Sequence, residues 1–369
     1  MKTLELLKRI PKVDIHCHLD GSVRTATIID AARKHNFKLP TEDPQQLNKY
    51  VQVSPTCKSL TDFLKRFEFF YDFLKFPDVV ERISYELCED VSKENIKYLE
   101  VRFAPFLQSS DRFSIEDVIR TAISGLMQGA RDFHIGVGAI VCIYRSLPDD
   151  INRLTVSLAE KYFGKGVAGI DLAGDETKYP AERYAEFFEY ARKRRIPITC
   201  HAGEAAGAES IRKALELGAR RIGHGVHLAE DEGLYKKVMD EGIPIEMCLT
   251  SNVQTQVVKS YKTHPFLKFY EDGLKVTLNT DDRSVSGIDL THEYLVAVEQ
   301  YGLKISDIIK IILNGINALF LPESEIDNIK KCMSGIIERM LLEERSGRAG
   351  GTTTGEKNDF QRDRIPEHY

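Results

Sequence analysis

Four short fragments of the chain carry side chains that bind metal ions or move protons. Each follows an apolar, β-branched stretch, so each is expected at the point where a strand ends. Several imidazoles and a carboxylate delivered together suit a catalytic zinc, which binds a few protein groups and keeps a position for water. The fragments are His16-Cys17-His18, His201-Ala202-Gly203-Glu204, Ile222-Gly223-His224-Gly225 and Asn279-Thr280-Asp281-Asp282.

The first fragment places two histidines on one face of a strand. His16 and His18 are two residues apart, so in a strand both side chains point the same way. A lone histidine in an apolar run is usually a hydrogen-bonded core residue. Two together, joined by His201 and Asp281 from other strand ends, instead indicate a metal site. Nitrogen and carboxylate ligands favour one Zn²⁺, although iron, manganese or cobalt accept the same ligands.

Zinc motifs of other chemistries are absent from the sequence. His292-Glu293 is not followed by a histidine at the fourth position, so there is no HExxH helix. The HxE and PCxxC signature of cytidine-type deaminases is also missing. The seven cysteines are scattered without a CxxC pair, which excludes a cysteine-rich structural zinc.

Eight apolar stretches that alternate with helical patterns are expected to be strands. Eight βα units in one chain indicate an α/β fold, a closed (β/α)₈ TIM barrel. Such barrels build their sites at the C-terminal ends of the strands, where all four fragments fall. The expected strands are Val13–Cys17, Tyr98–Phe103, Gly136–Ile143, Val167–Leu172, Ile196–Cys200, Arg221–Gly223, Ile243–Cys248 and Leu274–Leu278.

The connection between the first two strands is far longer than a normal βα loop. It holds an amphipathic aromatic stretch that includes Phe63 and Phe67. An aromatic stripe at helical spacing is most simply part of the core. Long insertions in βα loops, however, usually serve the site. We therefore expect a helical insertion that forms a lid over the barrel mouth, with Phe63 and Phe67 as substrate contacts.

Composition limits the partners and the location. The net charge of −5 and the lack of a long basic run disfavour nucleic acid and a membrane surface as partners. Scattered cysteines and an N-terminus without an apolar signal core favour a reducing, cytoplasmic location. Residues 1–345 are expected to form one domain with a closing helix near Ile305–Phe320. Residues 346–369 are rich in Gly, Thr and charged residues and are expected to be a disordered tail.

From Pro11 to Leu342 the sequence resembles the adenosine deaminases of the amidohydrolase superfamily. Beside the four fragments, Tyr98-Leu99-Glu100-Val101-Arg102-Phe103-Ala104-Pro105 and Asp171-Leu172-Ala173-Gly174-Asp175-Glu176 are similar to family segments. The fourth strand ends without the lysine that two-metal relatives carry. The resemblance therefore implies a single zinc held by His16, His18, His201 and Asp281.

The resemblance also implies catalytic roles. A bound zinc lowers the pKa of its water to about 7. His224 would lie beside that water and accept its proton or stabilise charge, and Asp281 would hydrogen-bond it. Glu204, protonated, would donate to the ring nitrogen next to the carbon that loses its amino group, a form of help worth roughly 10² to 10⁴ in rate.

Three further residues are implied to contact the substrate. Asp282 would share a proton with the imidazole-ring nitrogen of the purine, and Gly174 would offer its backbone N–H to the pyrimidine ring. Asp20 would bind the 5′-hydroxyl of the sugar, although taken alone it is simply a turn or cap carboxylate. Relatives that act on the free base commonly have Glu there, so Asp favours a nucleoside.

The activity implied is hydrolytic deamination of adenosine and 2′-deoxyadenosine, small-molecule purine nucleosides. An alternative is a deaminase of adenine, of a 5′-modified adenosine or of an aminofutalosine-type compound. A barrel that hydrolyses an amide, lactone or phosphoester, and a non-enzymatic binding barrel, are the other classes considered. The sequence gives no oligomeric state. The remaining histidines, His35, His134, His264, His292 and His368, are expected to be solvated or to pack ordinarily.

Overall fold

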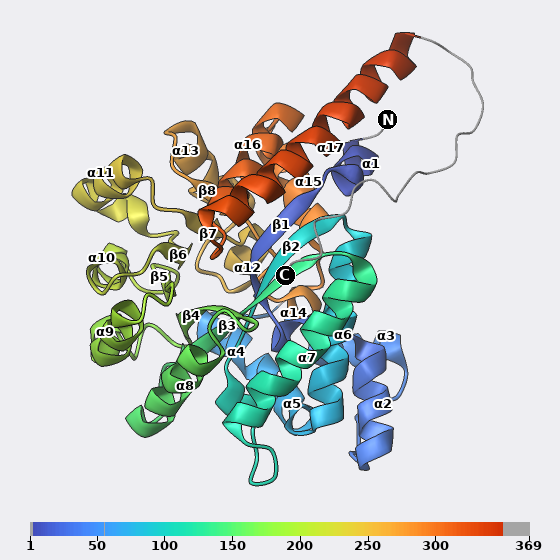
Figure 1. Cartoon of the computed structure of the whole chain (residues 1–369), viewed down its shortest axis with the longest axis vertical. Helices are drawn as coiled ribbons and strands as arrows, with labels where there is room; N and C mark the ends of the chain where they lie inside the picture. Colours follow the sequence, from blue (N-terminus) through green and yellow to red (C-terminus); the bar gives the residue numbers. More distant parts are fainter. Residues whose placement is uncertain (1–2, 55, 350–369) are drawn as a thin grey trace.

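Eight parallel strands form a closed barrel in the computed structural model, which describes residues 3–54 and 56–349 (Figure 1). They pair in two sets of four, β1 to β4 and β5 to β8. Bridges between Ile170 and Ile198 and between Cys17 and Asp281 join the two sets, so the (β/α)₈ prediction is confirmed. The strands are β1 Lys12–His18, β2 Ile96–Phe103, β3 Gly136–Tyr144, β4 Val167–Ala173, β5 Thr199–Ala202, β6 Arg221–His224, β7 Ile245–Met247 and β8 Val276–Leu278.

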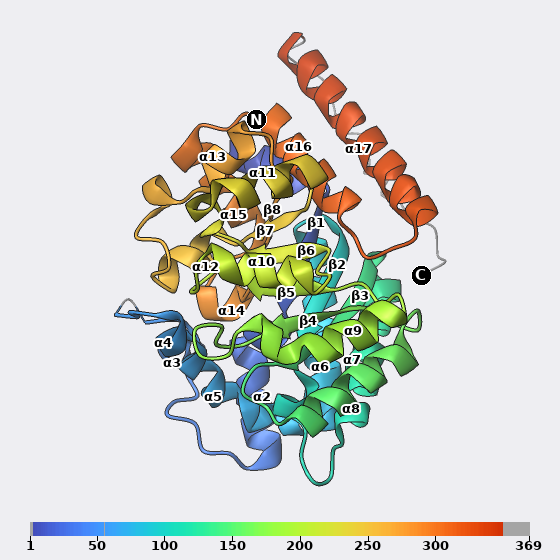
Figure 2. The ribbon, with the colours of Figure 1, turned by 90° about the vertical axis from the view of Figure 1, so that its left-hand side faces the viewer.

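Helices surround the barrel, and at least one separates each strand from the next (Figure 2). This layering buries both faces of the strands, which is why they are near-continuous apolar runs. The helices are α1 Thr3–Arg9, α2 Thr25–His35, α3 Pro44–Val51, α4 Leu60–Leu64, α5 Glu68–Tyr71, α6 Pro77–Lys93, α7 Ile115–Phe133, α8 Asp149–Tyr162, α9 Ala185–Lys193, α10 Ala208–Glu216, α11 Glu232–Glu241, α12 Leu249–Gln254, α13 Phe266–Glu271, α14 Arg283–Ser286, α15 Leu290–Tyr301, α16 Ile305–Asn317 and α17 Glu323–Ala349.

The packing of α6 against α7 shows how local sequence fixes this outer layer. Ser114 begins α7 by accepting a hydrogen bond from the backbone N–H of Asp117. Gly129 faces α6 so closely that an added Cβ would lie 2.5 Å from Cβ of Cys88. A glycine at this point therefore sets how near the two helices approach.

The long connection after β1 forms the helices α2 to α5 at one end of the barrel, beside α14, before α6 joins the outer layer (Figure 2). Its aromatic stripe is part of the core, because Phe63, Phe67 and Phe70 are all buried and pack in sequence at ring separations of 6.1 and 6.2 Å. Two of these rings, Phe63 and Phe67, also line the pocket described below. The stripe thus serves both as core and as a pocket wall.

The C-terminal helical region is longer than predicted. The expected closing helix is α16, which packs on β8 and β1 and ends at Asn317. The helix α17 follows and continues to Ala349, so the predicted start of the tail at Ser346 falls inside it. Residues 350–369, with His368, lie outside the described residues. Within the described part of the chain, no helix combines the length and apolar character needed to cross a membrane.

A buried ion pair anchors the loop that follows β8. Arg283 at the start of α14 is paired with Glu94, which ends α6, and both are more than nine-tenths buried. Oε2 of Glu94 also accepts the backbone N–H of Leu290 at 2.7 Å. One carboxylate therefore holds both ends of the segment between Asp282 and α15.

Removing that carboxylate should destabilise the fold strongly. Glu94→Ala leaves a buried guanidinium without its counter-ion, and breaking such pairs costs about 3 to 5 kcal/mol. Denaturant unfolding of Glu94→Ala should show a loss of this size, and the double variant with Arg283→Met should recover part of it. A loss below about 1 kcal/mol, typical of an exposed pair, would contradict the anchoring role.

Candidate metal centre and substrate pocket

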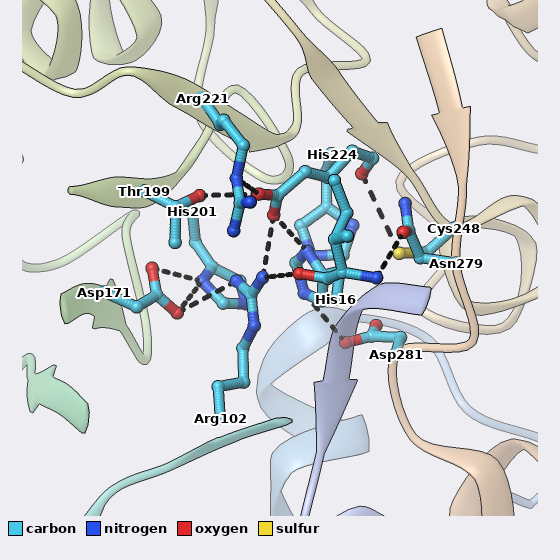
Figure 3. Close-up of polar contacts among 12 residues, drawn as sticks. His16, Arg102, Asp171, Thr199, His201, Arg221, His224, Cys248, Asn279 and Asp281 are labelled. Atoms are coloured by element: carbon cyan, nitrogen blue, oxygen red, sulfur yellow. Dashed lines mark hydrogen bonds and ion pairs between the residues drawn. The ribbon is translucent and has the colours of Figure 1, made fainter. Parts of the chain in front are cut away.

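Five side chains converge at the C-terminal mouth of the barrel. His16, His201, His224 and Asp281 are buried, and each offers a ligand atom within 4.8 Å of the others. Nε2 of His18 lies 3.2 Å from Nε2 of His201 and 3.3 Å from Oδ1 of Asp281. Figure 3 shows His16, His201, His224 and Asp281 around one centre. The side chains selected from the sequence as ligands are therefore neighbours in space.

The closure of the barrel positions this cluster. The backbone N–H of Asp281 donates to the carbonyl of His16 at 2.8 Å, and His18 donates to the carbonyl of Asp281 at 2.7 Å. Asp281 and His224 both have positive φ, at 59° and 63°, a conformation uncommon for residues other than glycine. Such backbone strain is characteristic of functional sites.

The chemistry of the cluster fits a divalent cation. Nδ1 of His16 lies 2.8 Å from Oε2 of Glu246, while its buried Nε2 lies 3.2 Å from Oδ1 of Asp281 and so faces the cluster. Nδ1 of His201 lies 2.9 Å from Oδ2 of Asp171. Histidines that bind metals typically have their second nitrogen held by a carboxylate in this way. Burial lowers the pKa of His18 well below its usual value, which favours the neutral imidazole that a metal requires.

Two buried arginines hold the carboxylates that orient these histidines. Arg102 contacts Glu246 at 2.9 Å and Asp171 at 3.2 Å, and Arg221 contacts Glu246 at 2.6 Å. Figure 3 shows Arg102 and Asp171 beside His201. Burial alone would raise the pKa of Glu246, but the two guanidinium groups hold it well below its usual range. We did not predict roles for Asp171 or Glu246, although a charge in the middle of the apolar run at 243–248 was a usable signal.

A pocket of about 590 Å³, including the part open to solvent, lies above the cluster. The cluster of histidines and Asp281 forms one wall, and the insertion forms another with apolar side chains. The predicted substrate contacts all line this pocket, and so does the predicted acid Glu204, whereas His16 is not part of the lining. The contacts are Asp20, Phe63, Phe67, Gly174 and Asp282.

Three carboxyl groups in the pocket have raised pKa values, which favours their protonated form. Oε2 of Glu204 lies 3.7 Å from Nε2 of His224. Burial, together with the nearby charges of Asp281 and Glu176, raises the pKa of Glu204 well above its usual value. Burial and Asp281 do the same for the pKa of Asp282, and burial raises the pKa of Asp20 to about 6.

The backbone around the pocket is also specific. Glu176, which we did not predict, accepts the N–H groups of Gly203 and Ala206 at 3.1 and 2.8 Å and so fixes the turn that carries Glu204. Gly174 has φ of 98°, and an added Cβ would lie 3.2 Å from the ring of Tyr144. A side chain at position 174 would therefore be strained and crowded against the pocket wall.

Buried histidines and a carboxylate at the C-terminal rim of a parallel (β/α)₈ barrel have the arrangement of a TIM-barrel enzyme site. The sequence pattern of the family described as "Adenosine deaminase" matches residues 11–336. An adenosine deaminase from Clostridium acetobutylicum is 39% identical over 332 residues, which cover 90% of this chain and 99% of that protein. The chain belongs to the adenosine deaminase family, a family of hydrolytic deaminases.

Solved structures agree with this assignment. An N6-mAMP deaminase from Arabidopsis has 28% identity and a TM-score of 0.80, and the match covers 90% of this chain and 99% of that one. An amidohydrolase from Burkholderia ambifaria, solved with bound Zn, has 22% identity and a TM-score of 0.82, with coverage of 93% and 94%. At that identity the second likeness establishes the shared fold alone.

Metal analysis tests the cluster directly. The purified chain should retain close to one zinc after dialysis, and His16→Ala should lose it because a ligand held by Glu246 is removed. His134→Asn is a matched control, since this histidine ends α7 in the left-handed conformation that asparagine tolerates. Full zinc occupancy in His16→Ala, measured by atomic absorption, would remove His16 from the ligand set.

Proposed function

We propose that the chain hydrolyses adenosine and 2′-deoxyadenosine to inosine and 2′-deoxyinosine, with release of ammonia. The ligands of a single zinc are His16, His18, His201 and Asp281. The observation that carries the proposal is the position of Glu204, a buried carboxyl with a raised pKa beside the histidine and aspartate cluster. Purine deamination needs a proton donor of this kind next to an activated water.

Each part of the pocket has a task in this reaction. When bound, zinc supplies a water whose pKa is near 7. Glu204 donates its proton to the ring nitrogen beside the amino-bearing carbon, so that the carbon can accept the oxygen. The amino group leaves with a proton as ammonia, and one water is consumed for each ammonia released.

The other pocket residues orient the purine nucleoside. The N–H of Gly174 faces the pyrimidine ring, and Asp282, with its raised pKa, shares a proton with the imidazole ring. Phe63 and Phe67 provide apolar contact for the base, and the insertion that carries them acts as a lid. Oδ1 of Asp20 is buried without a hydrogen-bond partner among the described residues, which suits a sugar hydroxyl as its donor.

Adenine and 5′-modified or aminofutalosine-type adenine nucleosides are the alternative substrates. The solved neighbours include an adenine deaminase from Arthrobacter aurescens and the N6-mAMP deaminase. The buried Oδ1 of Asp20, which has no hydrogen-bond partner among the described residues, favours a free 5′-hydroxyl over a 5′-phosphate, whose negative charge the carboxyl would repel. We also propose a cytoplasmic location, supported by the buried thiols of Cys17, Cys88 and Cys200, which are not in disulfides.

Replacing the proton donor should separate catalysis from metal binding. Glu204→Gln keeps the size of the side chain but cannot donate a carboxyl proton, so turnover of adenosine should fall by roughly 10² to 10⁴ while zinc content is unchanged. The matched control is Glu216→Gln, half-exposed on α10. Substantial activity in Glu204→Gln, followed by the absorbance change on deamination, would overturn the acid role.

Asp20 can be tested by pairing a variant with a trimmed substrate. Asp20→Ala should lower kcat/KM for adenosine by about 10- to 100-fold, the value of a hydrogen bond to a charged group. The same variant should treat 5′-deoxyadenosine as the unaltered enzyme does, because that substrate lacks the hydroxyl. An equal loss on both substrates, or equal turnover of adenine and adenosine by the unaltered chain, would refute the assignment.

A further inference from the structure

A line of hydrogen bonds leads from the outer layer of the barrel to His224. Its first member is the backbone N–H of Phe266, which donates to Nδ1 of His264 at 3.1 Å. A backbone N–H can only donate, so this nitrogen of His264 must be the acceptor. The proton of the His264 ring is therefore on Nε2, and His264 is buried at 5% exposure.

The second hydrogen bond in this line determines the orientation of the Asn252 amide. Nε2 of His264 lies 3.2 Å from Oδ1 of Asn252, and Nδ2 of Asn252 lies 3.0 Å from Nδ1 of His224. Asn252 is fully buried on α12, and its backbone bonds to Cys248 and Val258 hold it in place. Reversing the amide would set its NH₂ against the N–H of His264, so the direction of the whole line follows from its first bond.

The last step fixes the state of His224. Its Nδ1 accepts from Asn252 and so carries no proton, which leaves the proton on Nε2. That N–H points into the pocket, where Oε2 of Glu204 lies 3.7 Å away. His224 is buried at 1% exposure, and its Nδ1 is held by Asn252, so the ring has little freedom to turn.

We propose that Asn252 and His264 are positioning residues that hold His224 as a hydrogen-bond donor toward the oxygen that adds to the purine. This inference deepens the proposed function and rests on it. The role of His224 is then to stabilise charge as it develops, rather than to remove a proton. In this tautomer Nε2 of His224 carries a proton and cannot bind a metal. The cation ligands are then His16, His18, His201 and Asp281.

Exchanging the amide for a carboxylate tests the orientation. In Asn252→Asp the ionised side chain can only accept, so Nδ1 of His224 must carry a proton, and Nε2 of the neutral ring becomes an acceptor. Loss of a preorganised donor costs roughly 10² to 10³ in kcat, and KM should change little. Asn314→Asp is the matched control, because Asn314 likewise donates through Nδ2, to the carbonyl of Val276, away from the pocket.

A second pair of variants covers the outer step and any failure of Asn252→Asp to fold. His264→Gln can still accept from Phe266 and donate to Asn252, so it should keep kcat near that of the unaltered enzyme. His264→Phe fills the space without either bond and should lose about 10- to 100-fold, as outer-shell partners do. Equal effects of the two substitutions would overturn the proposal.

The tautomer itself can be observed in the zinc-loaded chain without substrate. Nitrogen NMR of ¹⁵N-histidine-labelled protein, with His224→Gln to assign the signal, should show His224 protonated on Nε2, and on Nδ1 in Asn252→Asp. A proton on Nδ1 in the unaltered chain would overturn the proposal. If the proposed substrate were wrong, the tautomer would still be found while adenosine was left unreacted, so the two failures are distinguishable.

Discussion

The seam between β8 and β1 is the interaction on which the rest of the site depends. The backbone of Asp281 pairs with His16 and His18, and this pairing both closes the barrel and brings the carboxylate of Asp281 within 3.3 Å of Nε2 of each histidine. Folding and ligand placement are thus one event. A barrel that failed to close here would not bring the proposed cation ligands together.

Building so many ionisable groups into a barrel interior is costly, and pairing compensates for the cost. Arg102 and Arg221 neutralise Glu246 from two sides, and Arg102 also neutralises Asp171. The same carboxylates then hold His16 and His201, so the charges that make the interior tolerable also aim the ligands. The stability of the barrel and the proposed catalytic geometry therefore depend on the same contacts.

Much of this organisation could be predicted from the sequence. The eight strands are found close to the apolar runs that predicted them, because a strand buried on both faces leaves a continuous hydrophobic signature. The side chains that end those strands were expected at one rim by the polarity of a parallel barrel, and they line one pocket. Local sequence is therefore sufficient to predict the position of a residue where the fold type determines that position.

Contacts between distant segments could not be predicted in the same way. Glu246 and His16 are 230 positions apart in the chain, and nothing in a single sequence indicates that their side chains are in contact. His264 was expected to be an ordinary packing residue, since its role depends on an amide from another segment. Arg283 had no predicted role, and only the structure reveals Glu94 as its partner. The extent of α17 past Ser346 was missed because its polar residues carry no apolar pattern.

X-ray absorption spectroscopy at the zinc edge of the zinc-loaded protein tests the central claim most directly, because it reports the atoms around the metal without reference to activity. We expect nitrogen and oxygen neighbours alone, with imidazole nitrogens at about 2.0 to 2.1 Å and a single zinc for each chain. A sulfur neighbour at about 2.3 Å would place the metal on a cysteine elsewhere and contradict the site at the β8–β1 seam.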